Sequence, residues 1–70
     1  MFIKYENGIY NLEKVESIYT ENLKIILYYV DGKGIESWLD INFTSNSERD
    51  RLFNEIQDKL LRENCLIKVD

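Results

Sequence analysis

The clearest hydrophobic periodicity in the chain lies between Ser45 and Asn64. Apolar residues there recur at the spacing that lines one face of a helix, at Leu52, Phe53, Ile56 and Leu60. Ser45 and Glu48 have the spacing of a capping box, and Ser47 is an alternative N-cap. The pattern therefore predicts one amphipathic helix over about residues 46–63.

The rest of the chain consists of short alternating or apolar runs between turn residues, which is typical of strands. Asn7-Gly8 predicts the turn of an N-terminal hairpin. Leu12 and Val15, three residues apart, indicate one helical turn or an irregular corner that places both side chains inward. The expected strands lie within residues 2–43, and a short further strand is expected at about 65–69.

These elements predict an α+β fold in one domain over residues 1–70, with a four- to five-stranded curled antiparallel sheet and one C-terminal helix packed on one face. The helix should cover the apolar side of the sheet. The residues expected to be mostly buried are Ile3, Leu12, Val15, Ile18, Leu39, Ile41, Phe43, Leu52, Phe53, Ile56 and Leu60.

The strand at residues 23–30 is apolar on both faces apart from Lys24, so its orientation depends on the turn near Gly32. A two- or four-residue loop places Ile26 and Tyr28 inward, whereas a three-residue loop places Leu23, Ile25, Leu27 and Tyr29 inward. The second alternative is favoured because it keeps Lys24 out of the core. In the next strand, residues 35–43, strict alternation places Ile35 on the core side and Trp38 on the opposite side.

A pattern of turn and core residues extends through the first half of the chain, at Asn7, Gly8, Asn11, Leu12, Val15, Ser17 and Ile18. With the Asp31-Gly32 turn and the C-terminal helix, it resembles small PH-like proteins of Gram-positive bacteria and their phages. The resemblance covers most of the chain and implies a curled antiparallel sheet followed by one helix. It implies no active site, because its motif residues are turn and core residues.

The composition and charge of the chain indicate which partners and which location to expect. The net charge of −4 and the scattered basic residues disfavour direct binding to nucleic acid, which needs clustered Lys and Arg. The N-terminal residues lack the apolar region of a signal peptide, and the longest apolar run is too short to cross a bilayer. We therefore expect a cytoplasmic protein that does not act at a membrane.

The sequence offers no catalytic constellation, and no cofactor or metal is expected. There is no histidine, so Cys65 has no partner for nucleophilic catalysis and is interpreted as a buried structural thiol. Glu36 and Asp40 lie about 13 Å apart at the rise of a strand, too far for a carboxylate pair that hydrolyses glycosides. An enzyme is therefore not expected.

Trp38 is the most informative single residue. Alternation places it with Glu36, Asp40 and Asn42, and Tyr28 joins this face in the favoured register. An aromatic centre with a polar rim is typical of an interface, although a small domain can also recruit a tryptophan into its core. These five residues form the predicted interaction site.

Three functional hypotheses follow. The first is a non-enzymatic protein–protein interaction module, self-associating or bound to a protein partner through the aromatic sheet face. The second is a phage-type acidic inhibitor that blocks a basic nucleic-acid-binding site of a host defence enzyme, with Glu13, Glu16 and Glu21 adding to Glu36 and Asp40. The third, a small-molecule site between sheet and helix, lacks converging polar residues.

Overall fold

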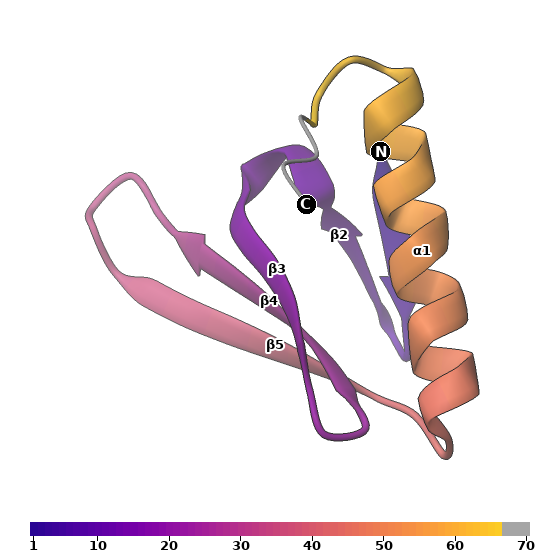
Figure 1. Ribbon diagram of the computed structural model, residues 1–70. Helices are drawn as coiled ribbons and strands as arrows, with labels where there is room; N and C mark the ends of the chain where they lie inside the picture. The colour runs from indigo at the N-terminus through magenta and orange to yellow at the C-terminus, as the bar shows by residue number, and fades with distance from the viewer. Residues whose placement is uncertain (67–70) are drawn as a thin grey trace.

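The computed structural model describes residues 1–66 and contains five strands, one short 3₁₀ helix and one α-helix (Figure 1). The elements are β1 (Phe2–Tyr5), β2 (Gly8–Asn11), the 3₁₀ helix η1 (Leu12–Lys14), β3 (Val15–Glu21), β4 (Lys24–Val30), β5 (Glu36–Asn42) and α1 (Asn46–Arg62). The α+β class and the C-terminal helix are confirmed. The predicted strand at 65–69 falls mostly outside the described residues.

The strands form two antiparallel sheets, so the prediction of one curled sheet is wrong. The hairpin β1–β2 stands alone, and β3, β4 and β5 form a three-stranded sheet in that order. The break lies at η1, where the Asn11 side chain accepts a hydrogen bond from the Glu13 backbone N–H at 3.0 Å. Of the two predicted alternatives, a helical turn or an irregular corner, the helical turn forms, and it removes residues 12–14 from the extended conformation, so that β2 and β3 do not pair.

The hairpin turn lies one residue earlier than predicted. Tyr5 pairs with Gly8, which leaves Glu6 and Asn7 as the two-residue loop, with Glu6 at a φ of 54°. A side chain on Gly8 would place its Cβ 2.5 Å from the Tyr10 hydroxyl oxygen. The glycine is therefore explained by the Tyr10 ring beside it on the same strand face rather than by the turn.

A β-bulge in β3 keeps two core residues on one face. Val15 pairs with Tyr29 and Ser17 pairs with Tyr28, so Glu16 is the extra residue of β3. Val15 and Ile18 are three positions apart, and regular alternation would place them on opposite faces. The bulge lets both pack against the core.

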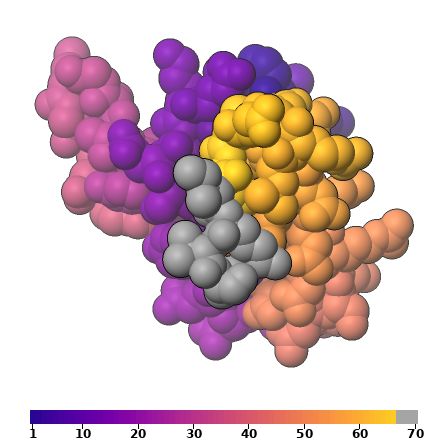
Figure 2. Space-filling view, turned by 45° about the horizontal axis from the view of Figure 1, so that its top comes forward, coloured from indigo at the N-terminus to yellow at the C-terminus, as the bar shows by residue number. Residues whose placement is uncertain are grey.

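The β4–β5 connection has five residues, because Val30 pairs with Glu36. The Asp31 carboxylate accepts the backbone N–H groups of Lys33 at 2.8 Å and Ile35 at 3.0 Å, which holds this loop. Ile35 therefore belongs to the loop and is 59% exposed, so its predicted place on the core side of the strand is wrong. The loop forms a tip that projects from the body of the molecule (Figures 1 and 2).

Loops of three and five residues differ by two, so they direct the side chains of β4 to the same faces. The favoured orientation of β4 is therefore confirmed. Ile25 and Leu27 point inward and are fully buried, at 0% exposure. The helix α1 and the β1–β2 hairpin lie on this same side of the three-stranded sheet (Figure 1). Leu23 is the exception to the favoured alternative, since it lies in the β3–β4 turn and is 42% exposed.

The core cluster joins both sheets to the helix. Its buried members are Leu12, Ile25, Leu27, Ile41 and Ile56, with further half-buried residues around them. Every residue on the predicted core list belongs to this cluster or packs against it, as buried or half-buried side chains.

The N-terminus of α1 is fixed by two side chains. Ser45 is the N-cap, and its hydroxyl accepts the Glu48 backbone N–H at 3.2 Å. The Glu48 carboxylate accepts a hydrogen bond from the Thr44 hydroxyl at 2.9 Å, so only one half of the predicted capping box forms. Arg49 also donates to the backbone carbonyl of Asn22, which ties the first turn of α1 to the β3–β4 turn.

Candidate functional site

The face of the three-stranded sheet opposite to α1 and the hairpin, here called the outer face, carries the predicted interaction residues. Tyr28 on β4 pairs directly with Trp38 on β5. Their ring centroids are 5.2 Å apart and the ring planes are inclined by 40°. Trp38 remains 56% exposed, so this aromatic pair stands on the surface rather than in the core.

Glu36 fixes the Tyr28 ring by a hydrogen bond. The Tyr28 hydroxyl donates to the Glu36 carboxylate at 2.7 Å. This bond raises the pKa of Tyr28 above its ordinary value, because ionising the phenol would remove the donated proton; partial burial and the charges of Glu36 and Glu16 act in the same direction. The carboxylates of Glu36 and Glu16 therefore both disfavour ionisation of the Tyr28 phenol.

Ile26 and Tyr19 extend the aromatic pair along the outer face. Ile26 lies between Tyr19 on β3 and Asp40 on β5, and next to Tyr28 on its own strand face. It is only 5% exposed but is not part of the core cluster, whereas Tyr19 is 40% exposed. We call the group of Tyr19, Ile26, Tyr28 and Trp38 the aromatic patch.

Asp40 and Asn42 have different surroundings. Asp40 forms an ion pair with Lys24, with 3.2 Å between the Lys24 Nζ and the Asp40 Oδ2. The backbone N–H of Asn42 donates to the Tyr5 hydroxyl at 3.3 Å, which connects the end of β5 to the N-terminal hairpin. The structure thus brings Tyr28, Glu36 and Trp38 together, places Asp40 beside them in an ion pair, and gives Asn42 a bond to the hairpin.

Tyr19 is not among the predicted site residues, and Glu16 is predicted only as part of the acidic surface of the inhibitor hypothesis. Both lie on β3, whose alignment with β4 depends on the bulge at Glu16. A signal for Tyr19 was present in the two-residue Asn22-Leu23 turn, since Glu21 paired with Lys24 places Tyr19 opposite Ile26. The bulge has a weaker signal, since Val15 and Ile18 are three positions apart and cannot share a face in a regular strand, but this spacing does not identify the extra residue.

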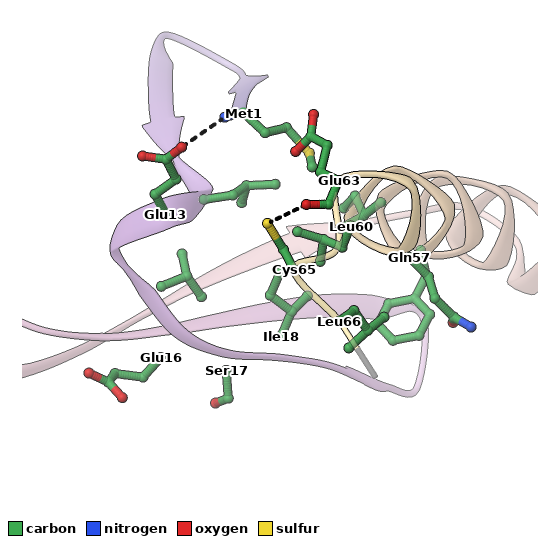
Figure 3. Close-up of a pocket in the computed structure, with 14 residues that line it drawn as sticks. Met1, Glu13, Glu16, Ser17, Ile18, Gln57, Leu60, Glu63, Cys65 and Leu66 are labelled. Carbon is green, nitrogen blue, oxygen red and sulfur yellow. Dashed lines mark hydrogen bonds and ion pairs between the residues drawn. The ribbon is translucent and has the colours of Figure 1, made fainter. Parts of the chain in front are cut away.

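A cavity of about 660 Å³ lies on the opposite side, between β3 and α1 (Figure 3). Ile18, Leu60 and Leu66 form part of its apolar lining, while Glu16 and Ser17 point away from it (Figure 3). Its other polar lining residues include Glu13, which is paired with the Met1 amino group at 3.9 Å. Specific ligand pockets need polar groups that converge, and none do among the side chains drawn here.

Residues 1–66 contain no cluster of three or more side chains suited to hold a metal ion.

Cys65 is exposed, and its thiol donates to the Glu63 backbone carbonyl at 3.5 Å. The interpretation of Cys65 as a buried thiol is therefore wrong, because the chain has left the helix before it. Within residues 1–66, α1 is too short and too polar to span a bilayer.

The aromatic patch with its acidic neighbours is thus the arrangement in which exposed apolar area, charge and an ordered geometry coincide. Searches of protein-family models, curated proteins and solved structures found no significant match to the chain.

Proposed function

We propose that this protein is a non-enzymatic protein–protein interaction module of the cytoplasm that binds a protein partner or a second copy through the aromatic patch. The observation that carries the proposal is the exposure of Trp38, which is 56% exposed while it is held at 5.2 Å from Tyr28. Tryptophan and tyrosine concentrate binding energy in interfaces, where burying their area is strongly favourable.

The surroundings of the aromatic patch support this proposal. Tyr28 is oriented by Glu36, and Asp40 is held by Lys24, so the side chains around Trp38 are already ordered before any partner arrives. Preorganised side chains lose less conformational entropy on binding. A hydrophobic centre with charged residues at its margin also matches the usual anatomy of interfaces.

Sedimentation velocity over a range of protein concentrations, followed by affinity capture with the immobilised protein, tests the proposal. Trp38→Ala should weaken the association by about 2 kcal/mol or more, roughly 30-fold in Kd, while the chain stays folded. Ile9→Ala is the matched control, since Ile9 is 70% exposed but lies on the hairpin. A strict monomer that captures no protein in a Trp38-dependent way would contradict the proposal.

A second candidate, an acidic inhibitor of a basic nucleic-acid-binding site, is favoured by the grouping of Glu16, Glu36 and Asp40 around the aromatic patch. Lys24 lies among these acids and neutralises Asp40, and Glu13 is bound to the N-terminus elsewhere. The charge is therefore less concentrated than in a mimic of a phosphate backbone. Competition between this protein and DNA for a basic nuclease domain would test this candidate.

A further inference from the structure

The strand β5 is an open edge of the three-stranded sheet. Within residues 1–66 it pairs with β4 alone. Just beyond the end of β5, the Phe43 N–H donates to the Leu23 carbonyl at 2.9 Å. This bond shows which residues of β5 direct their backbone groups toward β4. Because hydrogen-bonded pairs alternate in an antiparallel ladder, Ile41 and Leu39 direct their backbone groups toward β4.

The alternate residues of β5 direct their backbone groups away from β4. The backbone N–H and C=O groups of Glu36, Trp38 and Asp40 therefore point away from the sheet at its open edge. Asn42 confirms this phase, since its N–H also points outward and donates to the Tyr5 hydroxyl. Tyr5 closes that end, and the three residues before it present a row of backbone groups that a further strand can use.

The side chains beside this row define what such a strand must carry. Glu36, Trp38 and Asp40 occupy the outer face, so the opposite side chains of an added strand meet the Glu36 carboxylate, the indole and the Asp40 carboxylate, which already forms an ion pair with Lys24. Leu39 is half-buried and occupies the inner side of β5. On the outer face an added strand thus meets a carboxylate, the indole and a second carboxylate in turn, and on the inner face it meets Ser37 and Leu39.

We propose that the β5 edge binds an extended segment of a partner protein by antiparallel strand addition, and that this segment alternates basic and apolar residues. The proposal deepens the function proposed above and rests on it, because Trp38 belongs to both. Strand addition supplies affinity through backbone hydrogen bonds and specificity through alternate side chains. The net charge of −4 favours a basic segment as well.

A second copy of this chain fits the edge less well. Antiparallel pairing of two β5 strands centred on Trp38 would place Glu36 of each copy opposite Asp40 of the other. Like charges directly opposite each other are destabilising in a sheet. The acids therefore act against self-pairing at the edge and in favour of a basic partner.

A fluorescent, acetylated and amidated peptide, Lys-Val-Lys-Val-Lys-Val-Lys, provides the probe, with binding followed by anisotropy. In antiparallel addition the lysines lie opposite Glu36, Trp38 and Asp40, so the lysine amides face β5 and the valine amides face solvent. N-methylation of the lysine amides should weaken binding by at least about tenfold, whereas N-methylation of the valine amides should leave it nearly unchanged. The peptide with glutamate in place of lysine should not bind.

Two protein variants complete the test. Glu36→Gln should weaken binding of the lysine peptide by about two- to fivefold and reduce its dependence on salt. The proposal is overturned if the peptide does not bind, if both methylated forms bind equally, or if only methylation of the valine amides matters. Those results, combined with Trp38-dependent association, would leave the proposed function standing. Peptide binding with the expected methylation pattern but no effect of Trp38→Ala would instead contradict the aromatic-patch function.

Discussion

Tyr28 and Trp38 lie directly opposite each other on neighbouring strands, with ring centroids 5.2 Å apart, on the face of the sheet that the helix does not cover. Aromatic pairs of this geometry stabilise a fold by about 0.5–1.5 kcal/mol beyond their buried area. The pair therefore makes a modest contribution to stability and leaves most of the indole available for a partner.

Trp38→Ala should consequently lower the free energy of unfolding by about 1–2 kcal/mol, because the aromatic pair and the burial of less than half of the indole are lost. Ile41→Ala is the matched comparison on the same strand, since Ile41 is 3% exposed and points to the core. Its loss should reach about 2–5 kcal/mol. Urea unfolding followed by circular dichroism measures both, and equal losses would place Trp38 in the structural core.

The hydrogen bond from Tyr28 to Glu36 predicts a pH dependence. The pKa of Tyr28 lies above its ordinary value of 10.0, so the stabilisation is fully present below pH 10 and is lost as pH rises through the folded-state pKa. Glu36→Gln should shift this pKa back toward its ordinary value. Absorbance titration of tyrosinate, with Tyr28→Phe used to assign the signal, measures the change; an unchanged titration in Glu36→Gln would contradict this origin.

The Tyr29 hydroxyl is buried and has no hydrogen-bond partner among the described residues. Burial also raises the pKa of Tyr29. A buried hydroxyl without a partner loses its bonds to water, so Tyr29→Phe should stabilise the protein by about 1 kcal/mol. Tyr28→Phe, which removes a bonded hydroxyl from the neighbouring position, should not stabilise it. Thermal unfolding of the two variants side by side decides the point.

Ile56 is the one buried side chain of α1, at 6% exposure, and it joins the helix to Ile25 and Leu27. Ile56→Ala should cost about 2–5 kcal/mol, which is a large share of the stability of so small a domain. Glu55→Ala, at the exposed neighbouring position, should change stability by less than about 0.5 kcal/mol. A loss below 1 kcal/mol for Ile56→Ala would contradict the packing of the helix face.

The N-cap offers an equally direct comparison. Ser45→Ala removes the acceptor for the Glu48 backbone N–H and should cost about 1 kcal/mol. Ser47→Ala lies inside the first turn of α1 and should cost little, because alanine favours the helix. A greater loss for Ser47→Ala in urea unfolding would move the start of the helix to that residue.

The parts of the fold that the sequence predicts correctly depend on residues that lie close together in the chain. The helix follows from its apolar stripe and the Ser45 cap, and the turn at η1 follows from Leu12 and Val15. The orientation of β4 is predicted from the cost of burying Lys24 alone, and this prediction is confirmed.

The remaining differences depend on how segments meet. Glu16 bulges because Val15 and Ile18 both reach the core, a requirement that exists only once β4 is in place. Ile35 lies outside the core because the Asp31 side chain organises a longer loop than the Asp31-Gly32 turn suggests. Ile25 and Leu27 were absent from the predicted core list for a related reason, since their inward direction depended on that loop.

The order of strands has a consequence for how the chain folds. Every strand pairs with a strand next to it in sequence, through connections of two to five residues, so the sheets need no long loop to close. Such low contact order favours rapid folding. The long-range steps are the docking of the hairpin, through the bond between Tyr5 and Asn42, and the docking of α1, through Ile56 on the buried strands and Arg49 on the Asn22 carbonyl. Substitutions at Ile56 and Arg49 should therefore change the folding and unfolding rates through the docking of α1 and not through strand pairing, which stopped-flow kinetics in urea would measure.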